Sequence, residues 1–167
     1  GFSLAYAFTF NEIFLYAFVV SIAAAAADTW ASELGVLSKG APVKITNLKR
    51  CTPGTSGAVS IFGTAASAAG AIFISSAAVL LFDLSLPVFL MISVYGFLGS
   101  AVDTLLGAFV QVEYRCPACG VLTERKEHCG QGTNQTSGVS WFNNEAVNIS
   151  SILIVSFLCI ITSWYIT

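Results

Sequence analysis

The chain has 167 residues, of which 56% are hydrophobic and only 10% are charged. Soluble domains carry about 25% charged residues, so the composition excludes an ordinary soluble domain and indicates an integral membrane protein. The formal net charge of −2 provides no basic surface for nucleic acid, and the odd number of cysteines, five, argues against a secreted domain held by disulfides.

Four apolar segments are long enough to cross a bilayer, which takes about 20 predominantly apolar residues in a helix. We predict transmembrane helices over residues 13–34, 58–82, 87–110 and 146–166, within one membrane domain. The first ten residues have no Met and no basic start followed by a cleavage site, so they do not resemble a signal peptide. They look like the end of an upstream helix. The expected fold is an all-α, polytopic transmembrane helical bundle with cytoplasmic loops, in a chain that lacks upstream helices.

The first predicted helix carries a polar stretch, DTWASELG (residues 28–35), in its last two turns. Ionisable groups at the end of a membrane-length apolar run are costly to keep, so they are by default a functional-site hypothesis. Asp28 and Ser32 are four residues apart and share a helix face, whereas Glu33 pairs with Thr29 on a neighbouring face. The alternative is that Asp28 only marks where the helix leaves the bilayer.

A basic loop over residues 35–57 follows and closes with PGTSG, directly before the second helix. At the start of a helix the backbone amides are free and the helix dipole is positive, and the two glycines and two hydroxyls here would let a phosphate approach these amides. An ordinary turn and N-cap would use the same residues. The basic side chains of this loop could neutralise a polyphosphate or simply determine topology: Lys39, Lys44, Lys49 and Arg50.

Polar groups in the other helices are expected at the same membrane face. Asp28 and Asp103 lie close to the ends of two helices that run the same way, so both carboxylates should sit roughly 10 Å inside that face. The fourth helix starts there with NNEAVN, residues 143–148. All seven Lys and Arg residues fall in the two loops on this side, which makes it cytoplasmic by the positive-inside rule.

The converging oxygen atoms suit one or two Mg²⁺ ions, which take carboxylates together with substrate phosphates. The alternative is that buried Asn and Asp side chains hydrogen-bond to one another and hold the helices together. The sequence contains neither GxxxxGK[ST] nor GxGxxG, which excludes a P-loop enzyme and a Rossmann protein. His128 is the only histidine, so no Ser-His-Asp arrangement can be argued.

The loop over residues 111–145 contains the segment CPACGVLTERKEHCG. Cys116 and Cys119 form a CxxC pair, and His128 and Cys129 follow. Four ligands at this spacing are typical of a structural zinc site, which leaves no open catalytic position. A reduced, packed loop and a disulfide are the alternatives, and a disulfide is disfavoured in the cytoplasm.

Four motifs occur in the order found in one family of integral membrane proteins: ADTWASELG, PGTSGAVS, GSAVDTLLGA and NNEAVN. The chain resembles the transmembrane protein nineteen family, catalogued as domain of unknown function ninety-two, which includes the phytyl-phosphate kinase of plants. The resemblance covers nearly the whole chain from Ala23 onward. It implies transfer of the terminal phosphoryl group of a nucleoside triphosphate to an isoprenyl monophosphate.

We therefore predict a membrane-embedded prenyl-phosphate kinase of the phytyl- or geranylgeranyl-phosphate type. The donor would be CTP, UTP or ATP, and the acceptor an isoprenyl-phosphate lipid that enters from the membrane. The predicted catalytic residues are Asp28, Glu33 and Asp103, with Asp28 and Asp103 holding Mg²⁺. The predicted phosphate-binding residues are Lys39, Lys49, Arg50, Gly54, Thr55, Ser56 and Gly57. The residues expected to orient the acceptor are Ser32, Asn144, Glu145 and Asn148.

Other functions could use the same residues. The order of motifs is also similar, more loosely, to that of CDP-diacylglycerol synthases, so a nucleotidyltransferase that forms a CDP-lipid is one alternative. A transporter with Asp28 and Asp103 as ion sites is another, although transporters often have inverted repeats and a site at the bilayer midplane. A non-catalytic scaffold is the third.

Overall fold

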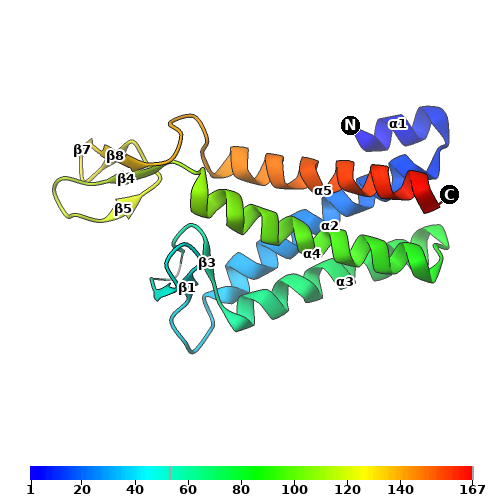
Figure 1. The fold of residues 1–167 in the computed structure, drawn as a ribbon, viewed down its shortest axis with the longest axis horizontal. Coiled ribbons are helices and arrows are strands. Elements are labelled where there is room, and N and C mark those ends of the chain that lie inside the picture. The colour runs from blue at the N-terminus through cyan, green and yellow to red at the C-terminus, as the bar shows by residue number, and fades with distance from the viewer. Residues whose placement is uncertain (53, 167) are drawn as a thin grey trace.

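The computed structural model describes residues 1–52 and 54–166, and helices make up most of it (Figure 1). The helices are α1 (Phe2–Thr9), α2 (Glu12–Gly35), α3 (Ile61–Phe82), α4 (Leu86–Phe109) and α5 (Asn144–Ile166). In the described part of the chain, α2 to α5 are long and apolar enough to cross a membrane. The predicted polytopic helical membrane fold is confirmed.

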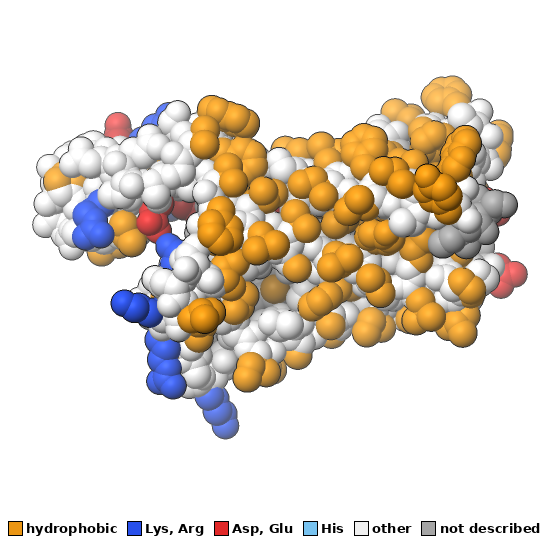
Figure 2. Space-filling view, viewed as in Figure 1, with side chains coloured by type: hydrophobic (Ala, Val, Ile, Leu, Met, Phe, Trp, Pro, Cys, Tyr) orange, Lys and Arg blue, Asp and Glu red, His pale blue; other side chains and the backbone are white. Residues whose placement is uncertain are grey.

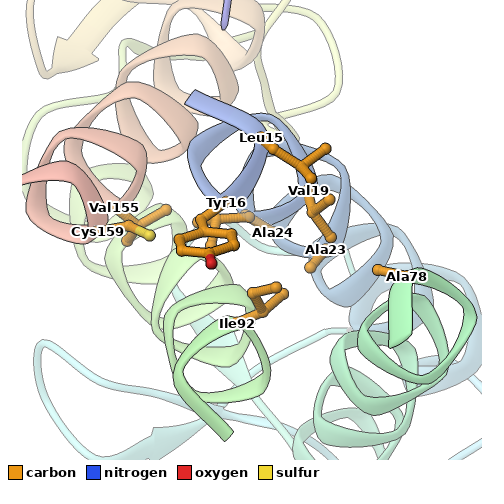
Figure 3. Packing of buried hydrophobic residues seen from close by; sticks show 10 residues of the cluster. Leu15, Tyr16, Val19, Ala23, Ala24, Ala78, Ile92, Val155 and Cys159 are labelled. Atoms are coloured by element: carbon orange, nitrogen blue, oxygen red, sulfur yellow. The ribbon is translucent and has the colours of Figure 1, made fainter. Parts of the chain in front are cut away.

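The central element of the bundle is α2, which packs against each of the other helices. Half of its most apolar segment is buried within the protein, against 28% to 33% in the other three spanning helices. Figure 3 shows Tyr16 and Ala24 of α2 beside Ile92 of α4 and Val155 of α5, with Val19 on the other side of α2 in the same cluster. The helix that carries the DTWASELG stretch, α2, is therefore also the helix that the other helices of the bundle surround.

Small residues let the neighbouring helices approach α2 closely. A Cβ atom placed on Gly96 of α4 would lie 2.7 Å from the Ala23 Cβ, and one on Gly70 of α3 would lie 3.0 Å from the Ala26 carbonyl oxygen. Helices in lipid gain little from hydrophobic burial against one another, so close van der Waals packing of small residues supplies much of their association. The alanine run of α2 and the glycines facing it provide this packing.

Two helix starts differ from the predicted ones because capping residues define them. Helix α3 begins at Ile61 rather than residue 58, and the Ser60 hydroxyl caps it by accepting a hydrogen bond from the Gly63 amide at 3.0 Å. Helix α5 begins at Asn144 rather than residue 146, because Asn143 Oδ1 accepts from the Ala146 amide at 3.0 Å. Side-chain caps of this kind satisfy amides that have no partner in the first helical turn.

Short strands occupy the two long segments that were predicted as loops, residues 35–57 and 111–145. The first loop folds into a sheet of β1 (Val43–Lys44), β2 (Lys49–Arg50) and β3 (Ala58–Val59), in the order β2-β1-β3. The second forms a sheet of β4 (Glu113–Arg115), β5 (Leu122–Thr123) and β8 (Asn134–Ser137), in the order β5-β4-β8, and a hairpin of β6 (Glu127–His128) and β7 (Gln131–Gly132). Both sheets lie at the same end of the bundle (Figure 1).

The surface of the helices and the surface of the end that carries the sheets differ in the side chains that they expose. Figure 2 shows hydrophobic side chains over the helical part, whereas Lys and Arg gather at the end that carries the sheets. Large apolar side chains such as Ile61 and Leu80 are 92% and 86% exposed, which is expected where lipid rather than water surrounds a helix. The distribution places the sheets outside the bilayer and the helices within it.

Candidate functional site

A cavity of about 670 Å³ opens at the end of the bundle that carries the sheets. Its walls come from the end of α2, the start of α3, the end of α4 and the start of α5, and residues 54–60 add one side. These are the elements that the sequence places at one membrane face, because antiparallel neighbours in a bundle bring alternate ends together.

Two carboxylates from different helices face this cavity. Asp28 of α2 and Asp103 of α4 both line it, are half-buried, and are close enough to interact electrostatically. The Ser151 hydroxyl donates to Asp103 Oδ2 at 3.2 Å, and the Ser100 hydroxyl lies toward Asp28. Two carboxylates that share a site repel one another, so a bound cation stabilises such a pair.

An amide oxygen in the lining of the same cavity has no hydrogen-bond partner among the described residues. This atom is Oδ1 of Asn148, and it is buried. A buried polar atom without a partner costs about 1–3 kcal/mol, which a ligand or cation would recover. Mg²⁺ prefers carboxylate and carbonyl oxygens, and Asp28, Asp103 and Asn148 supply them. The residues present therefore fit this cation.

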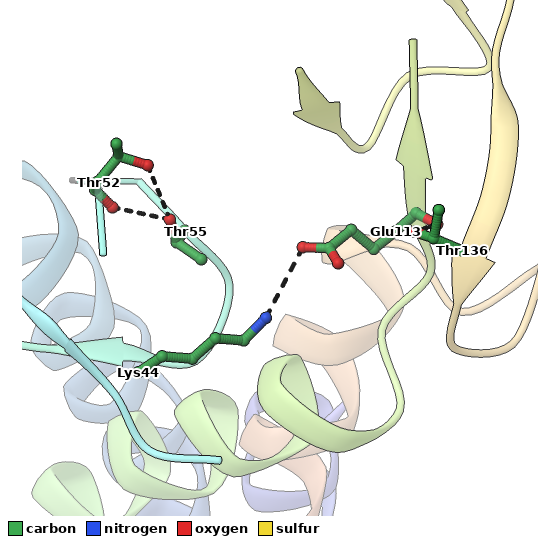
Figure 4. A network of polar contacts seen from close by, with 5 residues as sticks. All are labelled: Lys44, Thr52, Thr55, Glu113 and Thr136. Atoms are coloured by element: carbon green, nitrogen blue, oxygen red, sulfur yellow. Dashed lines mark hydrogen bonds and ion pairs between the residues drawn. The ribbon is translucent and has the colours of Figure 1, made fainter. Parts of the chain in front are cut away.

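The loop that ends at the start of α3 forms another wall of the cavity. Gly54, Thr55, Ser56 and Gly57 all line it, whereas Pro53 of the PGTSG motif lies outside the described residues. Figure 4 shows the Thr55 hydroxyl donating to the Thr52 carbonyl, at 2.8 Å. Gly57 has a φ of +72°, and a Cβ atom there would overlap the Ala108 methyl group. The loop is thus pressed directly against α4.

The basic residues of the same loop do not line the cavity. Lys39, Lys49 and Arg50 are exposed and lie outside its lining, and Lys44 forms an ion pair with Glu113, 3.8 Å from Nζ to Oε1 (Figure 4). In the described part of the chain, the charged side chains that line the cavity are all acidic: Asp28, Glu33, Asp103 and Glu124. Such a cavity attracts cations and repels a free phosphate.

The remaining predicted residues are only partly brought together. Glu33, Ser32 and Asn144 line the cavity, and the Ser32 hydroxyl donates to the Thr29 carbonyl at 3.0 Å. Glu145 lies in the first turn of α5 but is exposed and outside the lining.

Sequence reasoning missed several polar residues of the cavity, including Ser100, Glu124 and Gln111. Helical spacing could have found the first, because Ser100 lies three residues before Asp103 on the same face. The same spacing places Ser151, which bonds Asp103, three residues after Asn148. Glu124 and Gln111 are brought to the cavity by loop structure, which carries no comparable signal.

The predicted zinc ligands form a separate cluster outside the cavity. The ligand atoms of Cys116, Cys119, His128 and Cys129 all lie within 4.8 Å of one another. Hydrogen bonding from the Cys119 backbone lowers the pKa of the Cys116 thiol to about 6, whereas the hydrogen bond to the Cys119 side chain raises the pKa of Cys129 to about 11. The cluster thus favours ionisation of the Cys116 thiol over that of Cys129, because a negative charge on one sulfur disfavours a second negative charge nearby.

Comparison with known proteins identifies the family. A family model described as integral membrane protein DUF92 matches residues 2–156. The chain belongs to this family. The resemblance drawn from the four motifs is confirmed.

The DUF92 chain is similar to two curated proteins from distant organisms. Protein PGR of Arabidopsis thaliana is 37% identical over 153 residues, which cover 83% of this chain and 51% of the relative. An uncharacterized membrane protein of Methanocaldococcus jannaschii is 40% identical over 97 residues, 58% of this chain and 40% of the relative. The matches therefore span about half of the first relative's length and two fifths of the second's. No solved structure matches it.

Proposed function

We propose that this DUF92 chain forms the active site of a membrane-embedded prenyl-phosphate kinase, which transfers a phosphoryl group from a nucleoside triphosphate to an isoprenyl monophosphate. One observation carries the proposal: Asp28, Asp103 and the loop of residues 54–57 line a single cavity at the face that carries the basic loops. Phosphoryl transfer needs little covalent chemistry from a protein, but it needs positioning of the reactants and neutralisation of their charge.

The acidic lining supports a role for a divalent cation in binding the donor phosphates. Asp28 and Asp103 would hold Mg²⁺ with the Asn148 oxygen, which matches the small number of protein ligands that Mg²⁺ usually takes. The bound ion would neutralise charge on the phosphates of the donor. Residues 54–57 would contact phosphate oxygens from the opposite wall, and the exposed Lys39, Lys49 and Arg50 would attract the nucleotide toward the cavity.

An apolar strip on α4 would accommodate the prenyl tail. Phe97, Ala101 and Leu105 recur every four residues on one side of α4, and all three line the cavity. Leu105 is 51% exposed, so this strip reaches the lipid-facing surface of a spanning helix. The acceptor phosphate is already an anionic nucleophile and needs no strong general base, which agrees with a lining that has no histidine in the described part of the chain.

The family adds support. The four motifs resemble those of a family that includes the phytyl-phosphate kinase of plants, and this resemblance implies the proposed reaction. The cavity contains residues from all four motifs. The chain spans only about half of the length of Protein PGR, so the activity of the whole protein is itself part of this proposal.

The experiment is a phosphotransfer assay on the purified full-length protein. Phytyl, geranylgeranyl and farnesyl monophosphates are each combined with γ-labelled CTP, UTP or ATP and Mg²⁺. We expect label in a prenyl diphosphate, and its loss in Asp28→Asn. The matched control is Asp83→Asn, which makes the same change at an exposed residue at the opposite end of α3.

Other products would contradict the kinase. Pyrophosphate release with a nucleotide attached to the lipid would establish a nucleotidyltransferase instead. If no donor and acceptor pair yields labelled lipid, a transporter or scaffold would be the better interpretation, since an acidic cavity also suits transport of a cation.

A further inference from the structure

The cysteine and histidine cluster in the second loop has the dimensions of a metal site. The Cys119 and Cys129 sulfurs are 3.7 Å apart, and His128 Nδ1 lies 3.5 Å from the first and 3.2 Å from the second. A tetrahedral zinc ion, with Zn–S bonds of about 2.3 Å and a Zn–N bond of about 2.0 Å, separates neighbouring sulfurs by about 3.8 Å and sulfur from nitrogen by about 3.5 Å. The observed spacing is close to both values.

The same distances do not fit a disulfide. A bonded pair of sulfurs is about 2.05 Å apart, far shorter than the 3.7 Å between Cys119 and Cys129. All five cysteines are free thiols in the structure. Cys116, which is buried, completes the cluster, with its ligand atom within 4.8 Å of the other three.

The backbone on the CxxC side forms a tight turn around the ligands. The Gly120 amide donates to the Cys116 carbonyl at 2.9 Å, and the Cys116 amide donates to the Val121 carbonyl at 3.0 Å. Gly120 has a φ of +72°, a conformation that glycine adopts without steric cost. This turn directs the two cysteines of the CxxC pair toward one point.

The other side is a hairpin turn in which a cysteine occupies an unfavourable position. Strands β6 and β7 are joined by Cys129 and Gly130, whose φ angles are 53° and 75°. A two-residue turn with both angles positive normally has Asn-Gly or Asp-Gly. A cysteine is rarely found in this conformation, and strained backbone of this kind points to a functional constraint at the residue.

The loop has little else to hold it together. Between Gln111 and Asn143 the buried side chains in the structure are Gln111, Val112, Tyr114, Cys116 and Phe142, all near the two ends of the loop where it joins the bundle. A segment too small to form a hydrophobic core usually needs a disulfide or a metal ion to keep one conformation.

We propose that Cys116, Cys119, His128 and Cys129 bind a structural zinc ion. Three thiolates and one imidazole are a frequent ligand set for structural zinc, and four protein ligands leave no position for a substrate. The ion would fix the loop that carries Glu124, which lies between β5 and β6 and lines the cavity. The zinc ion would thus stabilise the part of the loop that borders the cavity, and it would take no part in the reaction itself.

The test is the metal content of the purified full-length protein, measured by plasma mass spectrometry without added zinc. We expect Cys119→Ser to contain about one zinc ion per chain less than the unmodified protein. Cys51→Ser, which changes a half-buried cysteine in the other loop, should retain the full content. Equal zinc in Cys119→Ser and unmodified protein would overturn the proposal, as would iron in place of zinc.

A second measurement does not depend on the folding of a variant. Removing the metal from the unmodified protein with a chelator should expose three additional reactive thiols, and reconstitution with Co²⁺ should give the absorption bands of thiolate-bound cobalt. An intact mass that is lower by the two hydrogens of a disulfide between these cysteines, with no zinc present, would contradict the site. Neither result depends on the kinase activity, so the two proposals fail separately.

Discussion

The bundle and the second loop, residues 111–143, achieve order in opposite ways. In the bundle, α2 is surrounded by helices whose glycines and alanines fit against its own alanine run, so close packing fixes the helices relative to one another. In the loop most side chains are exposed and the strands are two to four residues long. The cavity lies where the two regions meet. The proposed metal ligands Asp28 and Asp103 are on helices, whereas residues 54–57 and Glu124, which border the cavity, are on loops.

The largest expected effect is a loss of activity when a carboxylate in the bundle is made neutral. Asp103→Asn keeps the size of the side chain and the acceptor atom for the Ser151 hydroxyl, so the protein should fold. It removes a proposed ligand of Mg²⁺, and we expect phosphotransfer to fall by at least about 100-fold. Turnover and thermal unfolding of the same preparation check this.

A carboxylate of the loop provides the comparison. Glu113→Gln makes the same chemical change at a residue that lies outside the cavity lining and pairs with Lys44. Its activity should stay close to that of the unmodified protein. Equal losses in both variants would mean that the position of the carboxylate in the bundle is not what matters.

The next effect concerns packing. In Gly99→Val the new side chain would overlap Ala24 of α2, and overpacking of this kind costs about 1–3 kcal/mol of stability. Gly132→Val in β7 meets open space, because no heavy atom lies within 4 Å of the added Cβ. Thermal unfolding in detergent should show a lower melting temperature for the first variant and little change for the second. A reversed order would show that the loop, not the bundle, limits stability.

The smallest effect concerns the contact between the two loops. Lys44 and Glu113 are both partly exposed, and pairs of this kind contribute about 0–1 kcal/mol. A double-mutant cycle with Lys44→Ala and Glu113→Ala should give a coupling energy within that range, and the coupling should decrease at high salt. A coupling well above it would show that the two loops act as one rigid rim.

The sequence predicted the helices and the converging carboxylates well, because regular geometry links residue number to position. A rise of 1.5 Å per residue was enough to place Asp28 and Asp103 at one depth, and the structure has both in one cavity. Ser60 and Asn143, whose caps set the starts of α3 and α5, are recognisable types of capping residue, but the apolar pattern alone placed these boundaries two to three residues away.

The loops were less predictable, because contacts between distant residues determine them. Ala58–Val59 forms a strand only because β1 lies beside it, and a two-residue strand has no alternating pattern to read. Lys49 and Arg50 were expected near phosphates from their position in the chain, yet strand β2 keeps them exposed and outside the cavity lining. The acidic character of the cavity could not be derived without knowing which side of each loop faces it.

The strip formed by Phe97, Ala101 and Leu105 links the cavity lining to the half-exposed Leu105 on the lipid-facing side of α4, whereas residues 54–57 line the cavity from the loop side. A nucleotide would arrive from water past the loops, whereas a lipid would slide in sideways along α4. Because the two routes are separate, the nucleotide and the lipid could be bound in the cavity at the same time. Under the proposed function, both would be held together before reaction, so initial-rate plots should show intersecting lines rather than the parallel lines of an enzyme that releases one product before it takes its second substrate.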